Sequence, residues 1–312
     1  MTRAFFSSSR RYFSSASAVI FAVGLASTAA EAQLKVVTST SDLAAIAAEV
    51  GGTKVTTRHV SEGYQDPHYV EAKPSFVLQL RNADVWAFVG LGLEVGWMPL
   101  LLDGARNPKI RAGAPGYVDV SKSVPLLDIP AGDVDRSQGD VHPLGNPHYW
   151  LHPENGRRIA RMFQRKFSEL DPGNAVVYAA NERAFENKLT AAEQGWRSSL
   201  ASIAGKPVVA WHTSWRYLAL YTKMNIVGFI EPKPGVPPSP SHLAGLIQTI
   251  KRTRAKVIIM EPFYSRKTAD FVASKTGIRV LVLPPSVGGV RGLNDYVALM
   301  KSDIEKLAAA VQ

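Results

Sequence analysis

The sequence contains no cysteine. This absence excludes disulfide frameworks, thiolate metal sites and cysteine nucleophiles. Any transition-metal site must therefore take its ligands from His, Asp and Glu side chains. The chain can still form a sizeable core, because 46% of its 312 residues are hydrophobic and 20% are charged. These values are typical of a globular protein with one large domain or two lobes.

Long hydrophobic runs are also lacking. The apolar stretch 17–27 is much shorter than the roughly 20 residues that span a bilayer. It follows a basic segment and precedes an A-x-A motif at 30–32, so we predict a cleaved signal peptide over 1–32 and a periplasmic protein. Without a cysteine near Gln33, a lipid anchor is not expected. The segment 9–13 is either a twin-arginine export motif or a chance match to one.

Negative charge is scarce relative to positive charge, and the formal net charge is +10. The basic residues are scattered, apart from short groups such as 252–256. Since export is predicted, no nucleic-acid partner is expected. We interpret the charge as an aid to solubility or as attraction to the cell envelope.

Short aliphatic runs alternate with longer amphipathic stretches. Such runs are typical of strands in a parallel sheet that is covered on both faces, and the alternation predicts an α/β fold. A helix is expected at 41–52, with Ser41 or Asp42 as its cap. The predicted strands are 34–40, 83–90, 206–212, 255–262 and 278–285.

One long helix interrupts this alternation between residues 171 and 205. Its apolar residues recur at spacings of three and four, from Phe185 through Trp196 to Ile203, which gives one buried stripe. The alternation resumes afterwards. We therefore predict two lobes, 33–170 and 206–312, each with a parallel-rich sheet covered by helices and joined by one rigid helix over 171–205.

Three of the seven histidines are candidate metal ligands because of their positions. His68 and His148 each follow a proline and precede a tyrosine, a frame that rigidifies the approach to the ring. His212 ends a predicted strand, at the edge where open α/β sheets place their ligand sites. His152 lies four residues after His148, but Pro153 disfavours a helical conformation there, so we interpret His152 as structural.

Glu261 directly follows another predicted strand. A carboxylate at that place needs a partner, because its desolvation costs several kcal/mol. The partner is either a metal ion or a basic side chain, Arg266 or Lys267. The proline-rich segment 231–242 is either a surface loop or a wall of the cleft between the lobes.

These residues together resemble the metal-binding class of periplasmic solute-binding proteins that serve ABC importers for zinc and manganese. The resemblance covers nearly the whole chain after the signal peptide. It rests on four segments, which are "DPHYVEAKPS" (66–75), "NPHYWLHPENG" (146–156), "AWHTSWRYLALYTKMNIVGF" (210–229) and "PSPSHLAGLIQTIKRTRAKVIIMEPFYS" (238–265).

The resemblance implies two lobes joined by a long helix, with the metal in the cleft between them. The ligands would be His68 and His148 from the first lobe and His212 from the second. The family's usual fourth ligand is an aspartate near a position where this chain has Pro284 and Pro285. We therefore expect Glu261 as the fourth ligand, with Asp66 or water as alternatives.

Three imidazoles and one oxygen favour Zn²⁺ as the transported ligand, whereas manganese prefers more oxygen ligands. Manganese-binding relatives resemble this chain with a carboxylate at the position of His212. Manganese or iron binding within the same class is the alternative. Family members for zinc often carry a His-rich loop, but residues 128–145 hold only His142 and four Asp, so zinc scavenging by that segment is not expected.

The sequence favours a binding protein over an enzyme. A zinc hydrolase or hydratase is the rival, because three histidines with an open position are typical of catalytic zinc. The chain has neither an H-E-x-x-H nor a G-x-S-x-G motif. A metal-dependent adhesin is a third possibility that the sequence does not separate from transport. We expect a monomer that delivers zinc to an ABC permease in the inner membrane.

Overall fold

The computed structural model describes residues 1–5, 33–132, 139 and 142–312. The chain divides into two units, Met1–Glu31 and Ala32–Gln312, and the fold below is that of the second unit. Most of the predicted signal peptide lies outside the described residues. Across the residues that are described, no helix has both the length and the apolar character needed to cross a membrane.

The first sheet has four parallel strands in the order β2-β1-β3-β4. Its central strands are almost fully buried, as their aliphatic sequences predict. Helices follow three of the strands, and each of these helices carries the chain back to the start of the next parallel strand. The elements are β1 (Leu34–Thr40), α1 (Ser41–Gly51), β2 (Val55–Ser61), α2 (Pro74–Arg81), β3 (Val85–Phe88), α3 (Met98–Ala105) and β4 (Tyr117–Asp119).

The second sheet repeats this arrangement in the order β6-β5-β7-β8, again with all strands parallel. Its elements are β5 (Pro207–Ala210), α6 (Arg216–Thr222), β6 (Asn225–Phe229), α7 (Pro240–Thr253), β7 (Val257–Met260), α8 (Lys267–Thr276) and β8 (Arg279–Val282). The two parallel sheets covered by helices confirm the predicted α/β fold with two lobes.

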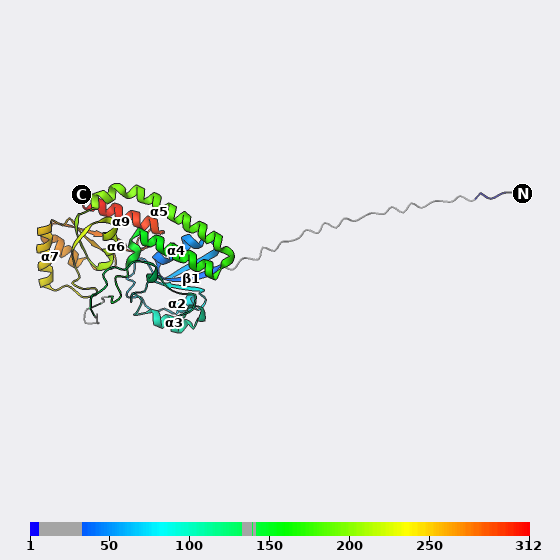
Figure 1. Ribbon diagram of the computed structural model, residues 1–312, viewed down its shortest axis with the longest axis horizontal. Helices are drawn as coiled ribbons and strands as arrows, with labels where there is room; N and C mark the ends of the chain where they lie inside the picture. Colours follow the sequence, from blue (N-terminus) through cyan, green and yellow to red (C-terminus); the bar gives the residue numbers. More distant parts are fainter. Residues whose placement is uncertain (6–32, 133–138, 140–141) are drawn as a thin grey trace. The chain divides into compact units, whose positions relative to one another are not determined.

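Two long helices, α4 (Pro153–Leu170) and α5 (Ala175–Ile203), connect the sheets. The predicted linking helix is present, but it begins later than expected. Residues Pro172–Asn174 form a separate 3-10 turn before α5. Figure 1 shows α5 running past α4 and past the C-terminal helix α9 (Tyr296–Ala310), and α5 packs against both of them.

One hydrophobic cluster extends from the first sheet to the second. It contains Val36 and Val85 from the first sheet, Val208 and Val257 from the second, and the buried side of α5 between them. Phe185, Leu189, Trp196 and Ile203 form the buried stripe of α5, as predicted. A shared core of this kind ties the lobes to the helix, because separating them would expose apolar surface to water.

The first turn of α1 is tied to the segment after β8. The prediction that Ser41 or Asp42 caps the helix is wrong: α1 has no side-chain cap, and both side chains bond to the backbone of Val287. The Ser41 hydroxyl donates to the Val287 carbonyl at 2.7 Å, and the Val287 N–H donates to Asp42 Oδ1 at 2.9 Å. Burial raises the pKa of Asp42 to about 7, against the hydrogen bond from Val287.

We expect Asp42→Asn to remove part of the pH dependence of unfolding. The folded protein keeps the Asp42 proton between its ordinary pKa of 3.8 and about 7, whereas the unfolded chain has lost it. Stability therefore falls as the pH rises through this interval, by about 1.4 kcal/mol per pH unit for this one group. Asparagine keeps the acceptor oxygen and does not titrate.

The measurement is urea unfolding of both metal-stripped proteins at pH 5 and pH 7. The variant should gain stability relative to the parent as the pH rises. A difference that is the same at both pH values would contradict the assignment of this titration to Asp42.

Candidate metal centre

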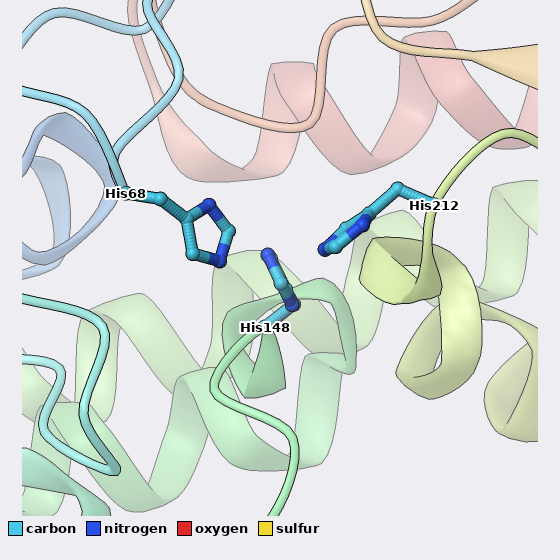
Figure 2. A group of neighbouring side chains, drawn as sticks. All are labelled: His68, His148 and His212. Carbon is cyan, nitrogen blue, oxygen red and sulfur yellow. The ribbon is translucent and has the colours of Figure 1, made fainter. Parts of the chain in front are cut away.

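Three histidines from distant parts of the sequence meet at one point. Each of His68, His148 and His212 offers one ring nitrogen, and these three atoms all lie within 4.8 Å of one another. The ring centroids form a nearly equilateral triangle with sides of 5.4, 5.4 and 5.3 Å. Figure 2 shows the three rings pointing toward a shared centre. The structure thus brings together all three predicted histidines.

His68 lies in the loop that follows β2, at the carboxyl end of the first sheet. Asp66, two residues earlier, holds it through one oxygen: Oδ1 accepts from the His68 backbone N–H at 3.0 Å and lies 2.7 Å from its Nδ1. Burial raises the pKa of Asp66, but the bond and charge of His68 outweigh this and hold it below the ordinary value. The Asp66 carboxylate is therefore the acceptor, and His68 Nδ1 carries the proton.

His148 is held in the same way, by one side-chain oxygen of the residue two positions earlier. It precedes a 3-10 turn, Tyr149–Leu151, that leads into α4. Asn146 Oδ1 lies 3.0 Å from both the backbone nitrogen and Nδ1 of His148. The Asn146 amide in turn donates to the Thr213 carbonyl at 2.9 Å. This bond joins the segment of His148 to the segment of His212.

His212 follows β5 in the second sheet, and its partner comes from the end of the neighbouring strand β6. Its Nδ1 lies 2.8 Å from Glu231 Oε2, and His212 is 3% exposed. Glu231 also accepts from the Trp211 indole N–H at 3.3 Å. Thus the first residue of the proline-rich segment 231–242 orients a candidate ligand.

In all three histidines an oxygen acceptor holds Nδ1, so Nε2 is left with its lone pair for a ligand. Orientation of this kind is usual for metal-binding histidines, whose second nitrogen donates to a carboxylate or carbonyl group. Burial lowers the pKa of His148 well below its ordinary value, with further lowering from the neighbouring histidines. Burial also lowers the pKa of His212, against the hydrogen bond to Glu231. Both rings are therefore neutral near pH 7, as metal binding requires.

Glu261 is fully buried at the end of β7, but it does not belong to the group of three close ligand atoms. Neither carboxylate oxygen has a hydrogen-bond partner of good geometry among the described residues, although the Ser214 hydroxyl lies close enough to lower its pKa. Burial dominates and raises the pKa of Glu261 to about 8. The alternative salt bridge to Arg266 or Lys267 is not formed among the described residues, since neither Glu261 oxygen has a partner and Arg266 pairs with Asp270 at 2.9 Å.

The sequence analysis missed His142. Its Nε2 lies 3.1 Å from His68 Nε2, and the two rings stack with centroids 5.2 Å apart. No local pattern marks this residue, because its neighbours come from other segments. His152 lies outside the group and caps α4, accepting from the Glu154 N–H at 3.2 Å. Its structural interpretation is confirmed.

Comparison with known proteins gives a consistent result. The sequence pattern of the ZnuA family, described as "Zinc-uptake complex component A periplasmic", matches residues 36–310. The iron ABC transporter substrate-binding lipoprotein MtsA of Streptococcus pyogenes is 25% identical over 90% of both chains. The zinc-binding lipoprotein AdcA of Streptococcus pneumoniae is 22% identical over 89% of this chain and 56% of its own length.

The fold agrees with these matches. A solved structure of a ZnuA deletion mutant with zinc bound is 25% identical, with a TM-score of 0.75 over 90% of this chain and 98% of its own. Members of this family are solute-binding proteins and not enzymes, and the ABC importers they serve also have membrane permease and ATPase components. The chain therefore belongs to the ZnuA family of metal-binding, substrate-binding proteins of ABC importers.

Proposed function

We propose that the protein binds one Zn²⁺ ion through His68, His148 and His212 and delivers it to an ABC permease for zinc uptake. The observation that carries this proposal is the convergence of three buried histidines whose Nδ1 atoms are all held by oxygen acceptors. This leaves three Nε2 lone pairs for one ion.

The ligand types support zinc. Zn²⁺ takes imidazole ligands in tetrahedral sites at about 2.0–2.1 Å, whereas manganese favours carboxylate and other oxygen ligands. The zinc named for AdcA and for the ZnuA structure supports the same metal. The iron named for MtsA keeps iron, together with manganese, as the alternative within this class.

The division of the ligands between the lobes suits capture and release. His68 and His148 come from the part before α5, and His212 comes from the part after it. We propose lobe boundaries at 33–170 and 206–312, with 171–205 as the link. In this proposal the protein is an exported periplasmic monomer whose signal peptide, over 1–32, is cleaved.

The fourth ligand predicted from the sequence is Glu261, and it stays a prediction. Its full burial and its unpaired oxygens support a role beside a cation, because a buried carboxylate without a partner is costly. Glu261 does not belong to the close group of ligand atoms, which favours an electrostatic effect on the bound ion over direct contact with it.

Isothermal titration of the chelator-stripped protein tests the proposal. We expect one zinc site per chain with a dissociation constant below about 1 μM, which corresponds to roughly 8 kcal/mol of binding free energy. A titration without zinc-binding heat, confirmed by equilibrium dialysis that retains no zinc, would contradict it.

We expect Glu231→Gln to weaken zinc binding by about 10-fold to 100-fold, the usual cost of losing a partner that orients a metal-binding histidine. The substitution removes the negative charge that holds His212 Nδ1 at 2.8 Å. Zinc titration measures the change. The matched control is Glu62→Gln, because Glu62 contacts His59 at 3.1 Å on the surface. Equal affinities in the two variants would refute the role of Glu231.

A further inference from the structure

His142 lies beside the three-histidine group, and its Nε2 is 3.1 Å from His68 Nε2. The backbone of Leu91 is a hydrogen-bond partner of its ring, and Nδ1 is the ring nitrogen on the side of the neighbouring Gly92. His142 Nε2 therefore carries a lone pair. His68 Nε2 also carries a lone pair, because Asp66 holds the proton-bearing Nδ1. Two such ring nitrogens at 3.1 Å need a cation between them, either a proton or a metal ion.

The separation suits a metal ion. Two nitrogens bound to one tetrahedral zinc at about 2.0–2.1 Å are roughly 3.3 Å apart, close to the observed 3.1 Å between His68 and His142. The His142 ring lies 6.4 Å from the His148 ring, against 5.4 Å between His68 and His148. His142 must therefore move toward His148 to complete a tetrahedron, which explains why it lies outside the close group.

The backbone places His142 beside the site independently of its ring. The Gly145 N–H donates to the His142 carbonyl at 3.3 Å, and the Asn146 N–H donates to the Leu127 carbonyl at 2.8 Å. This turn leads directly into the Asn146–Pro147–His148 frame. His142 also lines a cavity of about 370 Å³ that includes Asp128 from the first lobe and Arg216 from the second.

We propose that His142 is the fourth ligand of the metal, in place of Glu261, and closes the site on the side of this cavity. The inference rests on the proposed zinc function, and it adds a fourth imidazole to the three predicted from the sequence.

X-ray absorption at the zinc edge tests the proposal, using protein loaded with one equivalent of Zn²⁺. The unmodified protein should show four imidazole ligands, and His142→Ala should show three with one oxygen. The variant should still bind one zinc, with about 10-fold lower affinity and faster loss to a chelator. Glu261→Gln and the surface control His59→Ala should keep four imidazoles.

Three imidazoles in both the unmodified protein and His142→Ala would overturn the assignment of His142 and leave the proposed zinc function intact. Four imidazoles retained in His142→Ala would overturn it as well. An unmodified protein that takes up no zinc would instead contradict the proposed function itself. The variant His142→Asn, which keeps a polar side chain in the turn, should give the same three-imidazole result.

Discussion

Replacement of His148 by alanine is expected to lower zinc affinity by more than about 100-fold, beyond the range typical of residues that only orient a ligand. His148 is 2% exposed, and its ring centroid lies 5.4 and 5.3 Å from those of His68 and His212. Because the ring is buried between the other two histidines, water can replace its nitrogen only imperfectly. Competition against a fluorescent zinc chelator measures the loss.

The matched control is His152→Ala, four residues further along the chain. His152 caps α4 through the Glu154 N–H, so its loss should cost about 1 kcal/mol of stability and leave zinc affinity unchanged. If the two variants bind zinc equally well, His148 is not a ligand.

Zinc is expected to bind more tightly than manganese by on the order of 1,000-fold or more, as the usual affinity order of nitrogen-rich sites implies. The three converging groups are imidazoles, and the carboxylates Asp66 and Glu231 are already engaged with the Nδ1 atoms of His68 and His212. Manganese therefore finds few free oxygen ligands at this point.

The measurement is competition between the two metals on stripped protein, followed by elemental analysis of the bound metal. His212→Asp provides the comparison, because it adds an oxygen ligand where the zinc preference depends on nitrogen. The variant should lose zinc affinity more than manganese affinity. Manganese binding as tight as zinc binding in the unmodified protein would contradict the preference and would favour the manganese or iron alternative.

The sequence predicts the central strands of each sheet and one edge strand. The central strands β1, β3, β5 and β7 coincide with predicted aliphatic runs, because burial on both faces leaves a continuous apolar signal. The edge strand β8 is also predicted, since its sequence "RVLV" is largely aliphatic although it is only partly buried. The edge strand β2, "VTTRHVS", carries polar residues and is only partly buried. It forms through pairing with β1 over residues 55–61, and such pairing between distant segments leaves no local signal. Strand β6 is likewise an edge strand that is only partly buried, and it was not predicted from the sequence.

The candidate site shows a similar division. His68, His148 and His212 could be selected from the sequence because each lies at a place where the fold positions ligands. The repeated Asp/Asn-Pro-His frame also contained a further signal: Asp66 and Asn146 both stand two residues before a histidine and both hold its Nδ1. Glu231 and His142 could not be identified, since their partners lie on other segments.

One zinc ion is proposed to bind to the Nε2 atoms of His68, His148 and His212. The most direct test is an anomalous difference map from crystals of the zinc-loaded protein, with data collected on both sides of the zinc absorption edge. We expect one peak about 2.0–2.1 Å from all three Nε2 atoms. A peak elsewhere on the chain, or contact through the Nδ1 atoms, would contradict it.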